Sequence, residues 1–455
     1  MPANHSPWID ELRRGQVVGS LGGDEETDVV VIGAGIAGIS TAYFLLAKTD
    51  LRVTVLEADL IAHGATGHNA GQVTSQFEFG IPALEREFGT ELCASTVQDL
   101  QRGWGLLEAM RADAAPDVPC PRFKGAVAVT TKEQALGELE DMAAHARMGV
   151  PMASMALAED WHEAAAVKAM YPDLVRFVPA ADVMRALETQ DPAYRGYATY
   201  DRAVANSALL STRVAETLLA RYPERLVIHE QTRVADIALD REGAYVRGYR
   251  GTVRAKRVVL CTNGFAGFDV HDADDPALDP AREHPVEGVV GYMAGYYERA
   301  GRPPLAVSYM GEWEKDGDPY FYVTRRPYAS PHGHRDLVCV GGPHAHQDAG
   351  APYARANECP DVILKDVGGF VRKTFGLTNV PAFAFCWHGL MGYTDNGARL
   401  IGAEPRNPVL LYNLGCNGIG LLPSVYEAER VARIVGGEEV APTFFDPRAT
   451  PPLSS

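Results

Sequence analysis

The chain has 455 residues, 46% of them hydrophobic and 22% charged, a composition typical of a globular enzyme with two or three domains. Its formal net charge of −17 argues against a nucleic-acid or anionic-membrane partner, since either needs clustered lysine and arginine. The seven cysteines form no CxxC pair, and the N-terminus lacks the apolar run of a signal peptide. We therefore expect a soluble protein of the cytoplasm with reduced thiols.

The first residues are polar, and we expect residues 1–25 to form an extension over the surface. An apolar, β-branched run from Val29 to Ile32 follows and predicts a buried parallel strand. After it comes the glycine motif G-A-G-I-A-G, with Gly33, Gly35 and Gly38. These glycines suit a tight strand-to-helix turn, close approach of the backbone to a pyrophosphate, and close packing of the helix on the strand.

A helix is predicted from this motif to about Ala47, and its N-terminus would offer free N–H groups and a positive dipole to a phosphate. The next strand, from Arg52 to Leu56, ends at Glu57, which is placed to accept the ribose hydroxyls of an adenosine. Strand, glycine turn, helix, second strand and acid all stand in the expected order. The segment therefore predicts a site for an adenine dinucleotide.

Further elements follow along the chain. Residues 81–112 show helical spacing, and the helix predicted for residues 205–222 has Asn206 or Ser207 as its N-cap. A glycine turn separates the late strand L-L-Y-N-L-G from a terminal amphipathic helix. The other segments with helix or strand patterns are 123–131 (strand), a helix ending at Met148, and strands within 226–239, 244–264, 289–297 and 319–326.

This order predicts a fold of the α/β + β class. We expect a Rossmann-like dinucleotide-binding domain built from residues 26–100, 196–268 and 384–440. A mostly β substrate-binding domain with helices, from residues 101–195 and 269–383, would be inserted between these pieces.

Four stretches in this order resemble the D-amino-acid-oxidase-like superfamily of FAD-dependent amine and amino-acid oxidoreductases. That superfamily includes glycine oxidase, γ-glutamylputrescine oxidase, and the sarcosine and dimethylglycine dehydrogenases. The four stretches are G-A-G-I-A-G with Glu57; G-A-T-G-H-N-A-G-Q (64–72); T-R-V-A-D-I with V-V-L-C-T-N-G; and G-Y-T-D-N-G-A-R-L-I-G with G-C-N-G-I-G-L. The resemblance covers nearly the whole chain. It implies that the cofactor is FAD and that the fold is that of the GR2 type of flavoprotein.

The resemblance also implies which residues hold FAD. The turn at residues 418–421 would direct its N–H groups at the flavin pyrimidine oxygens and stabilise negative charge there. The residues implied as FAD-binding are Gly33, Gly35, Ile36, Ala37, Gly38, Glu57, Ala58, Thr66, Gly67, His68, Asn69, Ala70, Gly71, Gln72, Val234, Thr262, Gly264, Gly389, Gly418, Ile419, Gly420 and Leu421.

His68 stands where many relatives carry arginine. Because the dimethylglycine and sarcosine dehydrogenase branch has a histidine bonded to the flavin 8α-methyl in a similar loop, the resemblance allows a covalent link through His68. The alternative is that His68 only hydrogen-bonds phosphate or backbone. The cysteinyl link of other relatives is not expected, since Met391 occupies that position and Cys386 lies too far upstream.

The substrate residues are less clearly marked. We expect Tyr320, Tyr322 and Arg325 on one strand, together with His388, to contact an amine or amino-acid substrate. Arg325 or its neighbour Arg326 would bind a carboxylate through two hydrogen bonds, and His388 would be either a base or a buried structural histidine. The alternative is that these arginines are ordinary charged residues on the surface.

The electron acceptor stays open between oxygen and another compound. Several oxidases of this superfamily place a lysine above the flavin, and the matching position here is Cys339. No metal is expected, because the H-G-H (332–334) and H-A-H (344–346) clusters lack zinc-site spacing and are expected in surface loops.

Three alternatives to an amine oxidoreductase share the adenine-dinucleotide motif. An NAD(P)H-dependent monooxygenase usually has a G-D pair where this chain has R-L-I-G-A-E (399–404), and a disulfide reductase needs paired cysteines. The other rival, from a different class, is a non-catalytic flavin-binding subunit of a biosynthetic complex. The sequence favours oxidation of the C–N bond of an amine or amino acid to an imine that hydrolyses.

Overall fold

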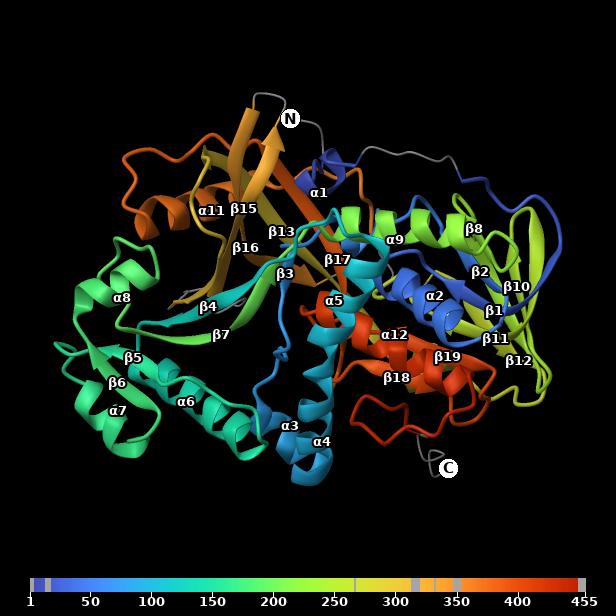
Figure 1. The fold of residues 1–455 in the computed structure, drawn as a ribbon, viewed down its shortest axis with the longest axis horizontal. Helices are drawn as coiled ribbons and strands as arrows, with labels where there is room; N and C mark the ends of the chain where they lie inside the picture. Colours follow the sequence, from blue (N-terminus) through green and yellow to red (C-terminus); the bar gives the residue numbers. More distant parts are fainter. Residues whose placement is uncertain are drawn as a thin grey trace.

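The structure of the chain, a computed structural model, describes residues 4–12, 18–265, 267–311, 320–330, 333–346 and 353–448. These residues form two β-sheets, which lie side by side along the long axis of the molecule (Figure 1). The first sheet has nine strands in the order β12-β9-β10-β11-β1-β2-β8, with β19 beside β11 and β18 beside β19. Its strands are β1 (Glu25–Ile32), β2 (Val53–Leu56), β8 (Leu226–His229), β9 (Val234–Leu239), β10 (Ala244–Gly248), β11 (Gly251–Leu260), β12 (Asp269–Asp272), β18 (Leu400–Ala403) and β19 (Leu410–Leu414).

The middle of this sheet is parallel. β1 pairs in parallel with β2 and β11, β2 pairs in parallel with β8, and β11 pairs in parallel with β19. Val29–Ile32 and Val53–Leu56 are buried throughout, as expected for strands covered on both faces. The Rossmann-like fold predicted from the sequence is confirmed.

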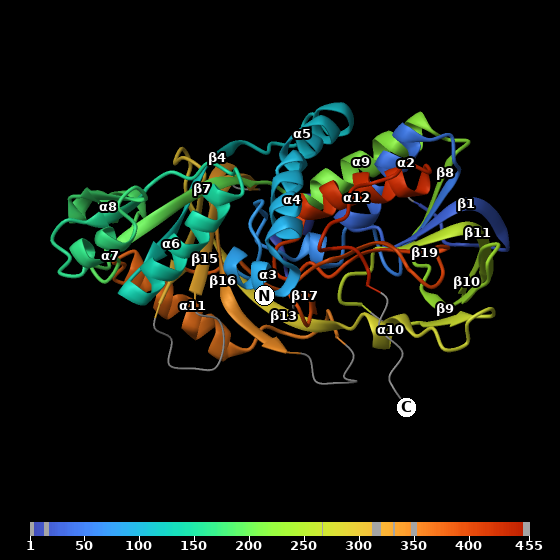
Figure 2. The same ribbon diagram turned by 90° about the horizontal axis from the view of Figure 1, so that it is seen from below.

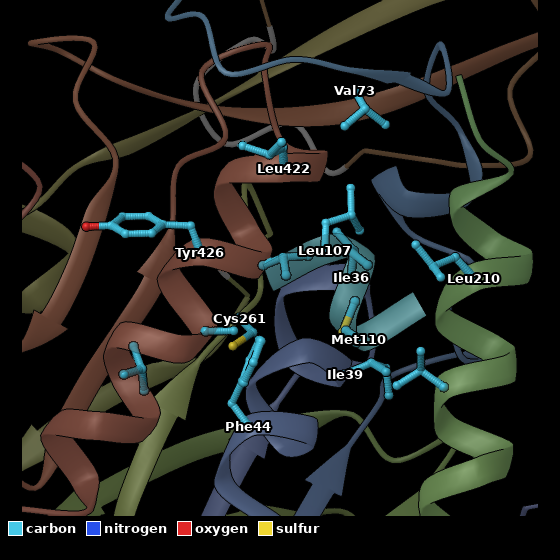
Figure 3. Close-up of a cluster of buried hydrophobic side chains, with 14 of the residues drawn as sticks. Ile36, Ile39, Phe44, Val73, Leu107, Met110, Leu210, Cys261, Leu422 and Tyr426 are labelled. Carbon is cyan, nitrogen blue, oxygen red and sulfur yellow. The ribbon is translucent and has the colours of Figure 1, made fainter. Parts of the chain in front are cut away.

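Four helices pack together on one face of this sheet. They are α2 (Ile36–Lys48), α5 (Arg102–Ala114), α9 (Ser207–Arg221) and α12 (Leu421–Val435). Figure 3 shows Ile36 and Ile39 of α2 near Leu107 of α5 and Leu210 of α9. Asn206 is the N-cap of α9, because its side chain accepts a hydrogen bond from the N–H of Leu209.

The second sheet is mixed and has ten strands, in the order β17-β13-β16-β15-β14-β4-β7-β5-β6, with β3 beside β7. Helices α6, α7 and α8 lie at the end of the molecule farthest from the first sheet (Figure 2). The strands are β3 (Gln72–Val73), β4 (Arg122–Val129), β5 (Met155–Ala158), β6 (Val175–Val178), β7 (Gly196–Val204), β13 (Val286–Arg299), β14 (Leu305–Met310), β15 (Tyr320–Ser330), β16 (Gly333–His346) and β17 (Phe385–Thr394). The remaining helices are α1 (Pro7–Asp10), the 3₁₀ helix η1 (Ala65–Gly67), α3 (Ile81–Phe88), α4 (Thr90–Leu100), α6 (Lys132–Arg147), α7 (Ala164–Met170), α8 (Ala180–Ala186), α10 (Pro280–Glu283) and α11 (Asp361–Thr374).

The expected domain boundaries can be compared with these sheets. β7 and β17 belong to the second sheet, although the expected division places both in the FAD-binding domain. The division into domains stays a prediction, and boundaries near residues 205 and 395 would follow the sheets more closely. The H-A-H segment expected in a surface loop lies in β16 instead, which corrects that expectation.

The N-terminal residues are not simply an extension over the surface. Trp8 in α1 is 0% exposed, its indole N–H donates to the carbonyl of Asn69 at 2.5 Å, and Ser6 Oγ donates to the carbonyl of Gly67 at 2.5 Å. The expectation is therefore wrong for residues 4–12, because this segment fills the space behind the 64–72 loop. One buried indole in a polar run gives little signal in the sequence.

Two cysteines also differ from expectation. Cys359 and Cys386 form a disulfide, with Cα atoms 6.5 Å apart, so the prediction of seven reduced thiols is wrong for this pair. The pair is 27 residues apart in sequence, and only the fold brings the loop before α11 against β17. The cytoplasmic localisation stays a prediction. In the part of the chain that is described, no helix is both long and apolar enough to cross a membrane.

Candidate active site

The glycine motif forms the turn between β1 and α2 at the centre of the first sheet. Gly33 has φ +103°, and a Cβ there would lie 2.6 Å from the carbonyl oxygen of Cys261, which follows directly after β11. A Cβ on Gly38 would overlap the carbonyl oxygen of Gly33. Both positions therefore require glycine, one for backbone conformation and one for the close approach of helix and strand.

Glu57 closes the same end of the sheet. Its carboxylate accepts a hydrogen bond from the N–H of Ala34 at 2.8 Å and another from the N–H of Asp59 at 2.9 Å. Burial raises the pKa of Glu57, while these two backbone hydrogen bonds act in the opposite direction. The carboxylate is thus fixed beside the glycine turn, where a ribose would lie.

The loop after Glu57 is held by Asn69. Its side-chain nitrogen donates to the carbonyls of Ala65 and Thr66 at 3.0 and 2.9 Å, and its oxygen accepts from the N–H of Gly71 at 2.6 Å. Thr66 Oγ1 accepts the N–H of Ile36 at the start of α2 at 2.9 Å. These contacts lock the 64–72 loop against the glycine turn.

His68 lies in this loop with one ring nitrogen engaged. Nδ1 is 3.0 Å from the carbonyl oxygen of Gly64, so it carries the proton in that hydrogen bond. Burial lowers the pKa of His68 to about 4, and the nearby Arg355 acts in the same direction. At neutral pH the imidazole is therefore neutral, with Nε2 as its unprotonated nitrogen.

A turn from the far end of the chain meets this region. The N–H of Cys416 donates to Asn263 Oδ1 at 3.0 Å, and Asn417 Oδ1 accepts from the N–H of Thr394 at 2.8 Å. These bonds attach residues 415–420 to the ends of β11 and β17. Helix α12 begins immediately after, at Leu421.

The described residues surround one continuous cavity of about 860 Å³ between the two sheets. It is large enough for a dinucleotide together with a small substrate. Most of the residues predicted to bind FAD line it: Gly33, Gly35, Ile36, Ala37, Glu57, Ala58, Thr66, His68, Asn69, Ala70, Gly71, Gln72, Val234, Thr262, Gly389, Gly418, Ile419, Gly420 and Leu421.

Three residues expected at FAD are not part of this lining. Gly38 packs on Gly33, Gly67 packs against Ile9, and Gly264 packs against the backbone of Met391. Their role in the structure is close packing behind the cavity wall.

Tyr320 and Tyr322, expected at the substrate, both line the cavity. Their rings are 5.9 Å apart, and the Tyr322 ring covers Gly341 on β16, where a Cβ would lie 2.5 Å from the ring. Tyr393, on β17, and Glu78 lie beside Gly418, since a Cβ on that glycine would be 2.7 Å from the phenol oxygen and 3.0 Å from Glu78 Oε2. His344 lines the same cavity.

Arg325 and His388 are not among the residues that line the cavity. Arg325 is 2% exposed and donates to both carboxylate oxygens of Glu188. His388 is buried, with Nε2 2.9 Å from the carbonyl of Asn357 and Nδ1 3.0 Å from the hydroxyl of Tyr353. The structure therefore supports neither the carboxylate-binding role for Arg325 nor the role of a base for His388.

Two further expectations concern cysteines. Cys339, matched to the lysine of several oxidases, is 1% exposed in the hydrophobic core and does not line the cavity. Burial raises the pKa of its thiol to about 12. Cys386 is in the disulfide, and Met391 lines the cavity.

Several residues that line the cavity were not predicted from the sequence, chiefly Arg202 on β7, Glu138 on α6, and Glu78. A signal existed for Arg202. In G-Y-A-T-Y-D-R-A-V the alternate residues Ala198, Tyr200 and Val204 are apolar or aromatic, and Arg202 interrupts that face. An arginine on the buried face of a strand is rare without a partner or ligand.

A family model described as FAD dependent oxidoreductase, DAO, matches residues 28–434. The chain belongs to this family. It is an FAD-dependent oxidoreductase, and FAD is its cofactor; the individual contacts with FAD stay predictions.

The fold of this DAO-family oxidoreductase is found in solved structures. Glycine oxidase from Geobacillus kaustophilus is 18% identical with a TM-score of 0.69, over 94% of this chain and 99% of that one. L-proline dehydrogenase from P. horikoshii is 16% identical with a TM-score of 0.64, over 93% of this chain and 97% of that one.

Sequence similarity to curated proteins is local. Gamma-glutamylputrescine oxidoreductase from Escherichia coli (strain K12) is 39% identical over 64 residues, which are 14% of this chain and 15% of that protein. The matches span only 13% to 15% of the length of the curated relatives.

Proposed function

We propose that this enzyme oxidises the C–N bond of an amine or amino acid to an imine, which then hydrolyses to a carbonyl compound. The observation that carries the proposal is the continuity of the cavity. One space joins the predicted FAD contacts to a pocket walled by Tyr320, Tyr322 and Tyr393. Two of the solved structures with this fold are named as a glycine oxidase and an L-proline dehydrogenase, and both of the substrates in those names contain a C–N bond.

When bound, FAD would accept the hydride from the substrate carbon that carries the nitrogen. The C–H bond breaks with its electron pair, the nitrogen lone pair forms the C=N bond, and the N–H proton leaves. The protein must hold a neutral amine in that orientation and keep water away from it.

Side chains near Gly418 suit this task. Burial raises the pKa of Tyr393 above its usual value, so its phenol keeps its proton at neutral pH. The carboxylate of Glu78 lies against the same glycine and is placed to accept a proton from a substrate ammonium group. We assign the positioning of the amine to these two residues.

We also propose that His68 forms a covalent link to the flavin. The imidazole nitrogen would bond to the 8α-methyl carbon as the methyl and the imidazole each lose a proton, and the two electrons released would pass to the flavin ring and then to the enzyme's electron acceptor. A neutral imidazole with Nδ1 bonded to the Gly64 carbonyl presents Nε2 as its nucleophilic atom. His68 is 9% exposed and lines the cavity, so Nε2 belongs to a group enclosed next to the cofactor. A tether there would raise the flavin potential and prevent loss of the cofactor.

Product analysis tests the reaction. The purified enzyme with FAD should release a carbonyl compound from one or more members of a panel of amines and amino acids. The amount of carbonyl product should equal the amount of electron acceptor that is reduced, whether that acceptor is oxygen or an artificial dye. No carbonyl product from any panel member with either acceptor would contradict the proposal.

A further inference from the structure

The substrate side of the cavity contains a buried cation that has no hydrogen-bond or ion-pair partner among the described residues. Arg202 is 3% exposed and lines the cavity. Among the residues that the structure describes, its guanidinium makes no hydrogen bond or ion pair, and Nε is fully enclosed without a partner. Its one ring contact is with Tyr200, 5.7 Å from the guanidinium carbon.

The other buried arginines behave differently. Removing a guanidinium from water is costly unless a carboxylate or other acceptor compensates it. Within the described ranges four arginines are buried, and each of the other three contacts a carboxylate. These pairs are Arg325–Glu188, Arg399–Glu427 and Arg430–Asp446. Arg202 is therefore the member of this set that has no carboxylate within ion-pair distance among the described residues.

Strand pairing places Arg202 beside the predicted flavin loop. β3 continues from that loop and pairs with β7, Gln72 with Val204 and Val73 with Ala203. Arg202 is the next residue of β7, so it lies just beyond the loop. On the other side it pairs with Phe123 of β4, and its stem lies across Gly125, where a Cβ would be 2.5 Å from Arg202 Cγ.

Two side chains frame the guanidinium. Tyr320 lies near both Arg202 and Tyr393, and all three line the same cavity. Glu138 of α6 also lines the cavity, but it forms no ion pair with Arg202 and instead accepts a hydrogen bond from Tyr200. Burial lowers the pKa of Arg202 to about 10, so it remains charged at neutral pH.

We propose that Arg202 binds a carboxylate of the substrate, so that the amine oxidised by this enzyme carries a carboxylate group. The inference rests on the proposed function and adds the substrate's second functional group. A planar guanidinium can donate two parallel N–H bonds to a carboxylate, and the enclosed site strengthens them. The carboxylate would lie in the same cavity as the amine at Glu78 and Tyr393.

Binding of substrate-free probes to the FAD-loaded enzyme tests this directly. Calorimetric titrations compare propionate and benzoate with their neutral counterparts, propionamide and benzamide. The wild-type enzyme should bind the carboxylates and not the amides. R202M should weaken carboxylate binding by about 30-fold or more, as expected for loss of a charged hydrogen-bonded contact, whereas R202K should retain part of it.

R122M is the matched control. Arg122 lies on the adjacent strand β4, but it pairs with Ala203, which puts its side chain on the opposite face of the sheet from Arg202. Carboxylate binding by R122M should equal that of the wild type. Equal carboxylate binding by R202M and the wild type, or no carboxylate binding by the wild type, would overturn the proposal.

Thermal unfolding separates a binding role from a structural one. Because Arg202 is a buried cation without a partner, R202M should be at least as stable as the wild type in the absence of ligand. Propionate should raise the melting temperature of the wild type and not that of R202M. A clear loss of stability in ligand-free R202M would assign Arg202 a structural role instead.

Different results would contradict the proposed reaction and the proposed carboxylate site at Arg202. If carboxylates bind in an Arg202-dependent way but no amine yields a carbonyl product, the proposed reaction is wrong and the carboxylate site stands. If amines without a carboxylate are oxidised equally well by the wild type and R202M, the reaction stands and the carboxylate site is wrong.

Discussion

The guanidinium of Arg325 donates one hydrogen bond of 2.7 Å to each carboxylate oxygen of Glu188. It also donates to the carbonyl of Pro303, at 3.0 and 2.9 Å. R325M should therefore lower the free energy of unfolding by about 2–3 kcal/mol, below the range for a fully buried pair, because Arg302 still binds Glu188. Denaturant unfolding of the FAD-loaded enzyme measures this. Propionate affinity should not change, and a loss of affinity in R325M at unchanged stability would return Arg325 to the substrate site.

Glu57 should control the affinity for FAD. E57Q keeps the size of the side chain but removes the charge that accepts from Ala34 and Asp59. Loss of a charged hydrogen-bond acceptor beside the ribose should raise the Kd for FAD by about 10- to 100-fold. Quenching of flavin fluorescence on binding to the apoprotein measures the change, with every variant made in an H68A background so that FAD can be removed. The control is E26Q, at the exposed start of β1, and a normal Kd in E57Q would contradict the role of Glu57.

His68 should determine whether the flavin stays with the precipitated protein or remains in the supernatant after acid precipitation. The proposed link predicts a yellow pellet for the wild type and a yellow supernatant for H68A. H63A is the control, since His63 is in the same loop but is not one of the residues lining the cavity. A yellow supernatant from the wild type would exclude the covalent link, and H68A should then differ only in FAD affinity.

Carboxylate affinity should depend on pH through Glu138. Burial raises the pKa of Glu138 to about 7, Asp141 adds to that rise, and Tyr200, Arg202 and His145 oppose it. Below pH 7 Glu138 is neutral and leaves the charge of Arg202 unopposed. Above pH 7 it ionises and repels a bound carboxylate, so the Kd for propionate should rise by about tenfold from about pH 6 to about pH 8.

E138Q should remove most of that slope, because glutamine has no charge to lose in this range. The same group affects stability with a defined sign. A carboxyl whose folded pKa is raised from 4.5 to about 7 contributes stability that is present below 4.5 and is lost as the pH rises through 7. Titrations at several pH values measure the slope, and an unchanged slope in E138Q would contradict its assignment to Glu138.

The FAD side of the site could be predicted because its residues come from local motifs. Gly33, Gly38 and Glu57 lie within one strand–helix–strand unit, where spacing alone brings them together. The late turn at Gly418 was recognised in the same way, from a short run of residues. The conformation of such segments is determined by their local sequence, whatever the fold of the rest of the chain.

The substrate side depends on packing between distant strands, which short patterns do not encode. Arg202 reaches the cavity through the pairing of β7 with β3 and β4, and Glu138 through the position of α6. On β15, strict alternation from Tyr320 and Tyr322 continues to Thr324, whose hydroxyl donates to the Ala70 carbonyl at 2.9 Å. Arg325 then points to the opposite face, so alternation alone already argued against it.

Anaerobic mixing of the FAD-loaded enzyme with amines tests the central claim most directly. A substrate that carries both an amine and a carboxylate should bleach the flavin absorbance in a single turnover, and admission of an electron acceptor should restore the colour. The same substrate deuterated at the carbon next to nitrogen should bleach it more slowly, since that C–H bond breaks in the step observed. Unchanged absorbance across a broad panel of amines and amino acids would contradict the account.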